Sequence, residues 1–225
     1  MLGRWTARDL LLAGTALAVA GACVRLGVWQ LDRLRQRRAR NTAVQEARER
    51  APLTLPAPGL PPDSMRQRRV SARGAYDYAR ERLWRPRIYN DAVGASVVTP
   101  LRLGDGSAVL VDRGWVPERA GGDLTAYRER DSVVTIEGFA VAAPRGLGDV
   151  DPKVLADSVP YPLLPVVVQL LPDGESQARP PLRVPPPALD DGPHLSYAFQ
   201  WFSFAVIVLV GTAFLLRRDL AAAPG

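Results

Sequence analysis

Two long apolar runs lie near the ends of this 225-residue chain and dominate its hydrophobic pattern. Leu10–Val24 contains no charged residue, and apolar positions continue as far as Leu31. Leu195–Leu216 is uncharged over 22 positions, which is about 33 Å of helix at about 1.5 Å per residue. Because the apolar core of a bilayer is about 30 Å thick, the pattern predicts transmembrane helices at residues 10–31 and 192–216.

Short runs rich in apolar and β-branched residues fill the region between these two spans, and turn-forming sequences separate them. The candidate strands are Arg69–Tyr76, Leu83–Tyr89, Ser96–Leu103, Ala108–Val116, Val133–Val141 and Leu164–Leu171. Asn90-Asp91 and Gly104-Asp105-Gly106 are typical turn sequences. Since no strong amphipathic helix stands among them, the strands predict a mainly antiparallel β domain at residues 63–191, either a small barrel or a sandwich.

Residues 32–62 connect the first span to this domain. Arg33–Arg50 is rich in Arg, Gln, Ala and Glu, which favours a helical extension of the first span. Five prolines follow between Pro52 and Pro62, and they predict an irregular linker because proline cannot continue a helix. Residues 1–9 and 217–225 are expected to be short tails.

The net charge of +6 belongs to the flanks of the spans and not to the β domain. Residues 41–191 contain 19 Lys and Arg against 20 Asp and Glu, whereas the rest of the chain contains 10 against 3. Basic residues beside apolar spans suit anionic lipid headgroups. We therefore expect contact with the lipid bilayer and no binding of nucleic acid.

The first apolar run also resembles a signal peptide. Ala20-Gly21-Ala22-Cys23 approaches a lipoprotein cleavage site, at which Cys23 would be acylated. Ala20 stands where such sites usually carry Leu, and Trp29 lies where an interfacial anchor is expected, so a retained helix is favoured.

Charge leaves the orientation of the spans open. Arg217-Arg218 indicates a cytoplasmic end for the second span, which would place the β domain outside. The Arg33–Arg40 cluster would instead draw the region after the first span inward.

The available side chains exclude several chemistries within the β domain. The single histidine is His194 and the single cysteine is Cys23, so residues 63–191 contain neither type. A Ser-His-Asp or Cys-His site is therefore excluded there, and zinc could use only carboxylates. A carboxylate pair for acid–base catalysis stays open, although solvated surface carboxylates are the simpler interpretation.

The start of the second span carries the remaining chemistry. His194, Tyr197 and Trp201 fall at i, i+3 and i+7 and share one helix face. Ala198 and Ala205 leave room beside that face for a flat ligand or for another helix. A histidine beside aromatic rings at a membrane interface can be an axial ligand of haem iron. The alternative is that His194 bonds to water or to loop backbone while the aromatics form an interfacial belt.

Four stretches resemble the Surfeit locus protein 1 (Surf/Shy) family, whose members are assembly factors for cytochrome c oxidase. Gly192–Trp201 reads GPHLSYAFQW and resembles the element that opens the second span of that family. Gly27–Arg37, GVWQLDRLRQR, resembles the element that ends its first span. Arg69–Asp77, RVSARGAYD, and Val109–Pro117, VLVDRGWVP, resemble its strand elements. Gly146–Pro187 matches only in its proline-rich character, so nothing is transferred there.

The resemblance implies a membrane-bound chaperone of the respiratory chain and not an enzyme. It places the β domain on the outer face and residues 1–9 and 217–225 in the cytoplasm, and we expect a bacterial plasma membrane. The family acts in forming the haem a site of oxidase subunit I, with haem A synthase as a further partner of bacterial members. The histidine of the GPHLSYA element is the proposed haem ligand, which here is His194. Our hypothesis adds Tyr197 and Trp201 as residues that line the haem.

Two competing functions remain open from the sequence. A haem-free scaffold would stabilise assembling oxidase subunits without a ligand at His194. A carboxylate-based hydrolase would need a catalytic Asp or Glu, and nothing in the sequence favours one. In the VLVDRGWVP element we expect Gly114 to support a tight backbone conformation and Trp115 to belong to the core.

Overall fold

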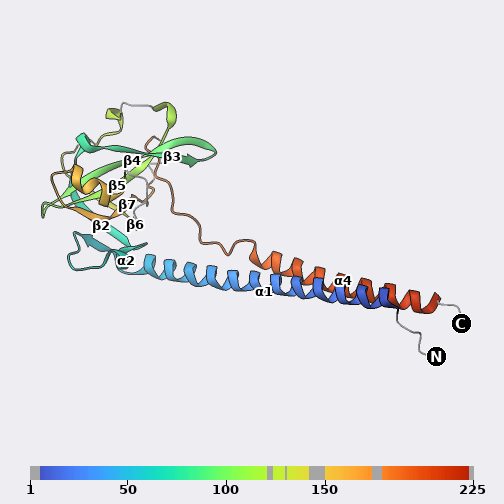
Figure 1. Ribbon diagram of the computed structural model, residues 1–225. Coiled ribbons are helices and arrows are strands. Elements are labelled where there is room, and N and C mark those ends of the chain that lie inside the picture. Colours follow the sequence, from blue (N-terminus) through green and yellow to red (C-terminus); the bar gives the residue numbers. More distant parts are fainter. Residues whose placement is uncertain (1–5, 121–123, 130, 142–149, 174–178, 223–225) are drawn as a thin grey trace. The chain divides into compact units, whose positions relative to one another are not determined.

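The computed structural model describes residues 6–120, 124–129, 131–141, 150–173 and 179–222 (Figure 1). The chain divides into two compact units. One is a helix pair within residues 1–43 and 189–225, and the other is a β domain at residues 44–188.

The helix pair consists of α1 (Ala7–Glu49) and α4 (His194–Ala222). The two helices run side by side in opposite directions, so the start of α1 lies beside the end of α4 (Figure 1). α1 is one continuous helix of 43 residues, which includes the first apolar run and the charged stretch after it. Both helices are long and apolar enough to cross a membrane.

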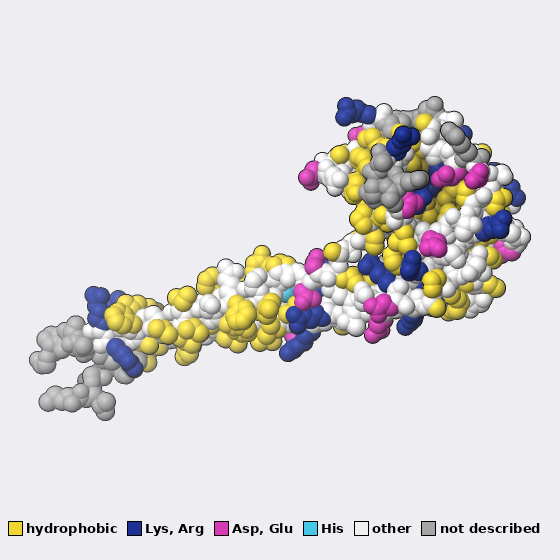
Figure 2. Space-filling view, turned by 180° about the vertical axis from the view of Figure 1, so that it is seen from behind, with side chains coloured by type: hydrophobic (Ala, Val, Ile, Leu, Met, Phe, Trp, Pro, Cys, Tyr) yellow, Lys and Arg dark blue, Asp and Glu magenta, His cyan; other side chains and the backbone are white. Residues whose placement is uncertain are grey.

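Many large apolar side chains of the helix pair are exposed, whereas most of its buried positions carry small residues. Figure 2 shows apolar side chains along its length, with charged side chains gathered toward its ends. The buried positions of α1 are Ala16, Ala20, Cys23, Gly27 and Leu34, and Ala198 and Ala205 are buried on α4. This pattern is typical of helices that associate in a membrane, where small residues let two backbones approach closely.

The β domain confirms all six predicted strands. They are β2 (Arg69–Tyr76), β3 (Arg82–Tyr89), β4 (Ala92–Leu103), β5 (Ala108–Pro117), β6 (Val134–Val141) and β7 (Leu163–Leu170). A further three-residue strand, β1 (Leu53–Leu55), lies inside the predicted proline-rich linker and pairs with β2 in parallel.

The sheet closes into a barrel-like form, because β2 pairs with both β6 and β4. The strand order is β1-β2-β6-β7-β5-β4-β3 with the additional pairing of β2 with β4. The pairing is mainly antiparallel, as predicted, with parallel pairs only at β1–β2 and β5–β7 among the described strands. Closure decides between the two predicted forms in favour of the barrel, since a sandwich keeps two separate sheets.

The core of the barrel is built mainly from valine, leucine and other aliphatic residues that the strands direct inward. β5 is buried along nearly its whole length, as expected for a strand between two neighbours. The main core cluster is Leu55, Met65, Val70, Ala72, Leu101, Leu103, Val109, Val111, Ile136, Ala140, Val166, Val168 and Leu170. The connections include the short helices α2 (Pro62–Met65) and α3 (Pro152–Leu155) and a 3₁₀ turn at Thr125–Tyr127.

Candidate functional site

The only histidine of the chain meets a glutamine of the other helix. His194 begins α4, and its Nδ1 lies 2.9 Å from Oε1 of Gln30 on α1. Both side chains are half-buried. The contact joins residues 164 positions apart, and it links the two sequence elements GVWQLDRLRQR and GPHLSYAFQW.

The loop that enters α4 is fastened to α1 just beyond this contact. Arg37 donates from Nε to the backbone oxygen of Asp190 over 3.1 Å, and Asn41 donates to the same oxygen over 2.8 Å. Arg38 pairs with Asp191 at 2.8 Å. These contacts hold the chain immediately before His194, so the histidine is placed from both sides.

The structure separates the three residues predicted to form the haem site by their surroundings. Trp201 is partly buried and packs against Ala20 and Cys23 of α1 and Ala205 of α4. Tyr197 is instead 46% exposed. His194 and Trp201 therefore face α1, and Tyr197 lies at the open edge of the same helix face.

The space beside Ala198 and Ala205 is taken by a helix and not by a free groove. Ala198 and Ala205 are 1% and 4% exposed. The ring of Phe202 lies so close to Gly27 that a Cβ atom there would be 2.6 Å from it. Of the two occupants that the sequence allows, a flat ligand or a helix, α1 is the one that fills the interior of the pair.

The contact with Gln30 decides which nitrogen of the His194 ring is used for hydrogen bonding. Because the amide oxygen Oε1 of Gln30 can only accept, Nδ1 of His194 donates this bond. In the neutral imidazole this arrangement puts the lone pair on Nε2, and the hydrogen bonds of the described residues engage the ring only at Nδ1. This is the state in which histidine ligates metals, with the second nitrogen held by a hydrogen bond.

The β domain contains a different polar cluster, and it is buried. Arg113 on β5 is 3% exposed and donates to Glu81 over 2.9 Å, and Glu81 is itself 4% exposed. The guanidinium lies over the rings of Tyr76 and Tyr78, 5.0 and 5.3 Å from their centroids. Thr99 donates to the same carboxylate over 3.0 Å. Such a matched, enclosed pair is typical of a structural role.

The next residues along β5 confirm two predictions about this turn. Gly114 has a φ of +133°, and a Cβ there would lie 2.7 Å from the backbone oxygen of Leu182, so only glycine fits. Trp115 is 7% exposed and donates from its indole nitrogen to the backbone oxygen of Arg87 over 3.1 Å. Trp115 therefore belongs to the core.

Asp112 adds a buried carboxyl beside this turn. It accepts a hydrogen bond from the backbone nitrogen of Gly114 over 3.1 Å and is only 6% exposed. Burial raises the pKa of Asp112 to about 6, against the lowering effects of nearby Arg87 and of hydrogen bonds from Gly114 and Ser96.

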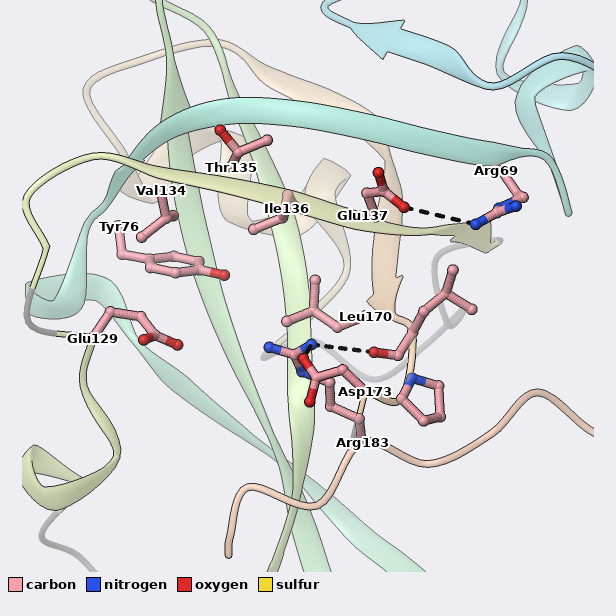
Figure 3. A pocket seen from close by; sticks show the side chains of 12 residues that line it. Arg69, Tyr76, Glu129, Val134, Thr135, Ile136, Glu137, Leu170, Asp173 and Arg183 are labelled. Atoms are coloured by element: carbon pink, nitrogen blue, oxygen red, sulfur yellow. Dashed lines mark hydrogen bonds and ion pairs between the residues drawn. The ribbon is translucent and has the colours of Figure 1, made fainter. Parts of the chain in front are cut away.

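An open pocket of about 470 Å³ lies at one edge of the barrel between β2, β6 and the end of β7 (Figure 3). Its charged side chains are matched: Arg69 lies 3.6 Å from Glu137, and Arg183 pairs with Asp173. Burial raises the pKa of Tyr76, which also lines the pocket. The pocket is thus lined both by ion pairs and by apolar side chains. Within the described residues no group of three or more His, Cys, Asp or Glu is placed to hold a metal ion.

Gln30 is the site residue that sequence reasoning missed as a partner of His194. A signal was present, because an antiparallel helix pair brings the end of the first span beside the start of the second. A polar residue at the end of one span and a histidine at the start of the other then lie at the same level.

Comparison with known proteins agrees with the four matching stretches. The SURF1 family profile matches residues 17–206. A SURF1-like protein of Monosiga brevicollis is 27% identical over 90% of this chain and 86% of its own length. An uncharacterized SURF1-like protein of Mycobacterium tuberculosis is 26% identical over 95% of this chain and 85% of its own. Surfeit locus protein 1 of Mus musculus is 32% identical over 49% of this chain and 41% of its own. The family profile extends over most of α1, the whole β domain and the first half of α4, and the chain therefore belongs to the SURF1 family.

Proposed function

We propose that this protein is an assembly factor for the haem-copper cytochrome c oxidase that assists insertion of haem a into subunit I through transient haem binding at the membrane. Membership of the SURF1 family implies a role in oxidase assembly. The observation that supports a haem step is the histidine at the outer end of the helix pair, whose Nδ1 is held by Gln30 and whose Nε2 is left for a ligand.

The residues present fit a haem held by one weak bond. When bound, haem a would supply an iron that accepts a nitrogen ligand. His194 supplies one neutral imidazole, and Tyr197 beside it presents a half-exposed aromatic ring. Because Trp201 and Phe202 fill the interior of the helix pair, we place the haem at its outer end. A role for Trp201 in lining the haem requires the packing against α1 to open.

A single ligand suits a carrier. Haem a is apolar and would partition into lipid without a protein to hold it, whereas a site with several strong ligands would retain it. In this proposal α1 and α4 both cross the bacterial plasma membrane, the β domain lies on the outer face, and both ends are cytoplasmic. Subunit I receives the haem and haem A synthase supplies it.

A haem-free scaffold is the second candidate, and one feature of the barrel favours it. Ile88 and Val93 face each other across the β3–β4 hairpin and are 73% and 52% exposed. Exposed apolar side chains at the tip of a hairpin suit contact with another protein, such as an assembling oxidase subunit.

Spectra of membranes test the proposed function. In cells from which the gene is deleted, reduced-minus-oxidised spectra should lose the haem a band while the bands of haems b and c persist. An unchanged haem a band would contradict a role in oxidase assembly. Haem retention by the purified protein that disappears in His194→Ala supports the carrier, and a purified protein that retains no haem supports the scaffold.

A further inference from the structure

The contact between α1 and α4 has a regular inner stripe that ends in a polar residue. Ala16, Ala20, Cys23 and Gly27 follow one another at steps of four, three and four, which keeps them on one face of the helix. Gln30, three positions later, continues that face. The next buried residue after it is Leu34, which is 5% exposed. Small or apolar residues are thus sufficient for packing on either side of Gln30, so packing does not explain why a polar residue stands there.

The glutamine has a defined partner. Its Oε1 lies 2.9 Å from Nδ1 of His194, a normal hydrogen-bond distance. An oxygen acceptor at this point selects the tautomer with the proton on Nδ1 and the lone pair on Nε2. The same hydrogen bond also fixes the rotation of the imidazole ring about the Cβ–Cγ bond of His194.

Contacts on both sides of this hydrogen bond hold the two helices as close together as the bond requires. On one side, Phe202 packs directly against Gly27, where a larger residue would not fit. On the other side, Asp190 and Asp191 are held by side chains of α1. The loop then turns at Gly192, whose φ of +66° suits glycine, and delivers His194 to Gln30.

We propose that Gln30 is a positioning residue for His194: it holds the imidazole in the tautomer and orientation in which Nε2 is offered to the haem iron. This inference rests on the proposed function. Hydrogen-bond partners of this kind orient ligating histidines, and their loss typically costs about 10- to 100-fold in metal affinity. A better acceptor at the same place makes the imidazole a stronger electron donor to the iron.

The test is a titration of the full-length protein, purified in detergent, with ferric haem a. Gln30→Ala and Gln30→Leu should bind about 10- to 100-fold more weakly than the parent protein. Leu keeps the volume and apolar packing of the position but lacks the acceptor, so it separates positioning from packing. Gln30→Glu keeps an acceptor oxygen and should retain binding. Gln36→Ala is the matched control, because Gln36 is an exposed glutamine of α1 that accepts a hydrogen bond from Arg33.

A spectroscopic readout adds a signature that packing does not produce. The iron–histidine stretching frequency of the ferrous complex should rise in Gln30→Glu, and the reduction potential should fall, because the charged acceptor strengthens donation from the imidazole. Loss of this frequency in His194→Ala identifies the ligand.

The outcomes separate the two proposals. If His194→Ala binds haem a as the parent does, the proposed haem function is wrong. If His194→Ala loses binding while Gln30→Leu keeps it within about twofold and Gln30→Glu leaves the stretching frequency unchanged, the role of Gln30 is overturned and that of His194 stands. Should Gln30→Ala fail to fold, the Leu and Glu variants decide the question.

Discussion

The helix pair and the barrel bury opposite kinds of side chain. The β domain buries large apolar residues such as Leu101, Leu110 and Val167, each 1% exposed or less. The helix pair buries mainly small residues such as Ala16, Ala20 and Cys23, and many apolar side chains lie on its surface (Figure 2). The barrel is ordered as in water, where apolar area is removed from solvent. The helix pair is ordered as in lipid, where close backbone approach replaces that driving force.

The two regions also treat their polar groups differently. In the barrel, Arg113 and Glu81 are almost fully enclosed and matched to each other. In the helix pair, His194 lies at one end, half-buried, with one ring nitrogen held. The enclosed pair is suited to supporting the fold, whereas one nitrogen of the histidine is not engaged by the hydrogen bonds of the described residues. In our proposal the functional group is therefore the half-buried histidine and not the enclosed ion pair.

The largest effect should come from breaking the enclosed pair of the barrel. Arg113→Ala removes the enclosed partner of the buried Glu81 carboxylate and leaves it only Arg128, which lies 3.8 Å away and is 39% exposed. This change should lower the free energy of unfolding by up to about 3 to 5 kcal/mol. Chemical unfolding of the full-length protein in detergent, followed by the fluorescence of the barrel tryptophans, measures it. Arg35→Ala is the matched control, because the Arg35–Asp32 pair is 76% and 51% exposed and should contribute at most about 1 kcal/mol. Equal losses in the two variants would remove the contrast between enclosed and exposed charges.

The buried carboxyl of Asp112 should make the stability of the β domain depend on pH. Burial raises its pKa to about 6, so between about pH 4 and pH 6 the folded protein keeps a proton that the unfolded chain has released. Stability contributed by this group is therefore present at low pH and is lost as the pH rises through 6. In the parent protein the free energy of unfolding should fall by about 2 to 3 kcal/mol as the pH rises from about 4 to about 6, and Asp112→Asn should remove this fall.

Unfolding curves at several pH values test the sign of this effect. Asp105→Asn is the control, because hydrogen bonds from Ser107 lower the pKa of Asp105, and its removal should change the pH dependence in the opposite sense. If stability of Asp112→Asn varied with pH as in the parent protein, the buried carboxyl would not be the source.

Gly27 tests whether the helix pair depends on small residues. Gly27→Ala places a Cβ within 2.6 to 2.9 Å of the Phe202 ring. The expected cost is about 1 to 2 kcal/mol, because a ring edge can turn to relieve part of the overlap. The native Cys23 and an Ala205→Cys substitution offer a readout, since both positions belong to one buried cluster.

Oxidative cross-linking of that cysteine pair should be slower in Gly27→Ala than in the parent. Gly14→Ala should leave it unchanged, because nothing lies within 4 Å of a Cβ there. Replacing Ile207, which is 64% exposed, by Cys should give no cross-link to Cys23. Efficient cross-linking from that outward position would contradict the packing of the pair.

The smallest effect should come from the exposed ion pair between Arg38 and Asp191 at the end of the helix pair. Arg38 and Asp191 are 58% and 45% exposed, so their interaction should contribute less than about 1 kcal/mol and weaken with salt. A double-mutant cycle with Arg38→Ala and Asp191→Ala at two salt concentrations measures it. A coupling as large as that expected for Arg113 and Glu81 would show that exposure does not decide the strength of these pairs.

The local sequence pattern predicted most strands of the barrel, but it could not predict which strands distant in sequence pair with one another. Arg69–Tyr76 was predicted with both bounds correct, because apolar alternation and turn residues are local signals. Leu53–Leu55 was missed, because three residues among prolines carry too little pattern. The closure through β2 and β4 depends on pairing between strands distant in sequence, which no local signal encodes.

The site was predicted in the same uneven way. His194 stood out because it is the only histidine and begins an apolar span. Its contact with Gln30, 164 positions away, and the packing of Trp201 against α1 both depend on how two helices distant in sequence meet. The i, i+3, i+7 spacing places Trp201 on the same face of α4 as His194, but it cannot show that α1 covers that face.

The most direct test of this account is the haem a content of membranes from gene-deleted cells that carry a His194→Ala copy. The protein should be present in the amount of the parent copy, as judged by immunoblot, so that its loss does not explain the result. We predict that the parent copy restores the haem a band and that His194→Ala leaves it low, with haems b and c unchanged. Full restoration by His194→Ala would contradict a haem contact at the end of the helix pair.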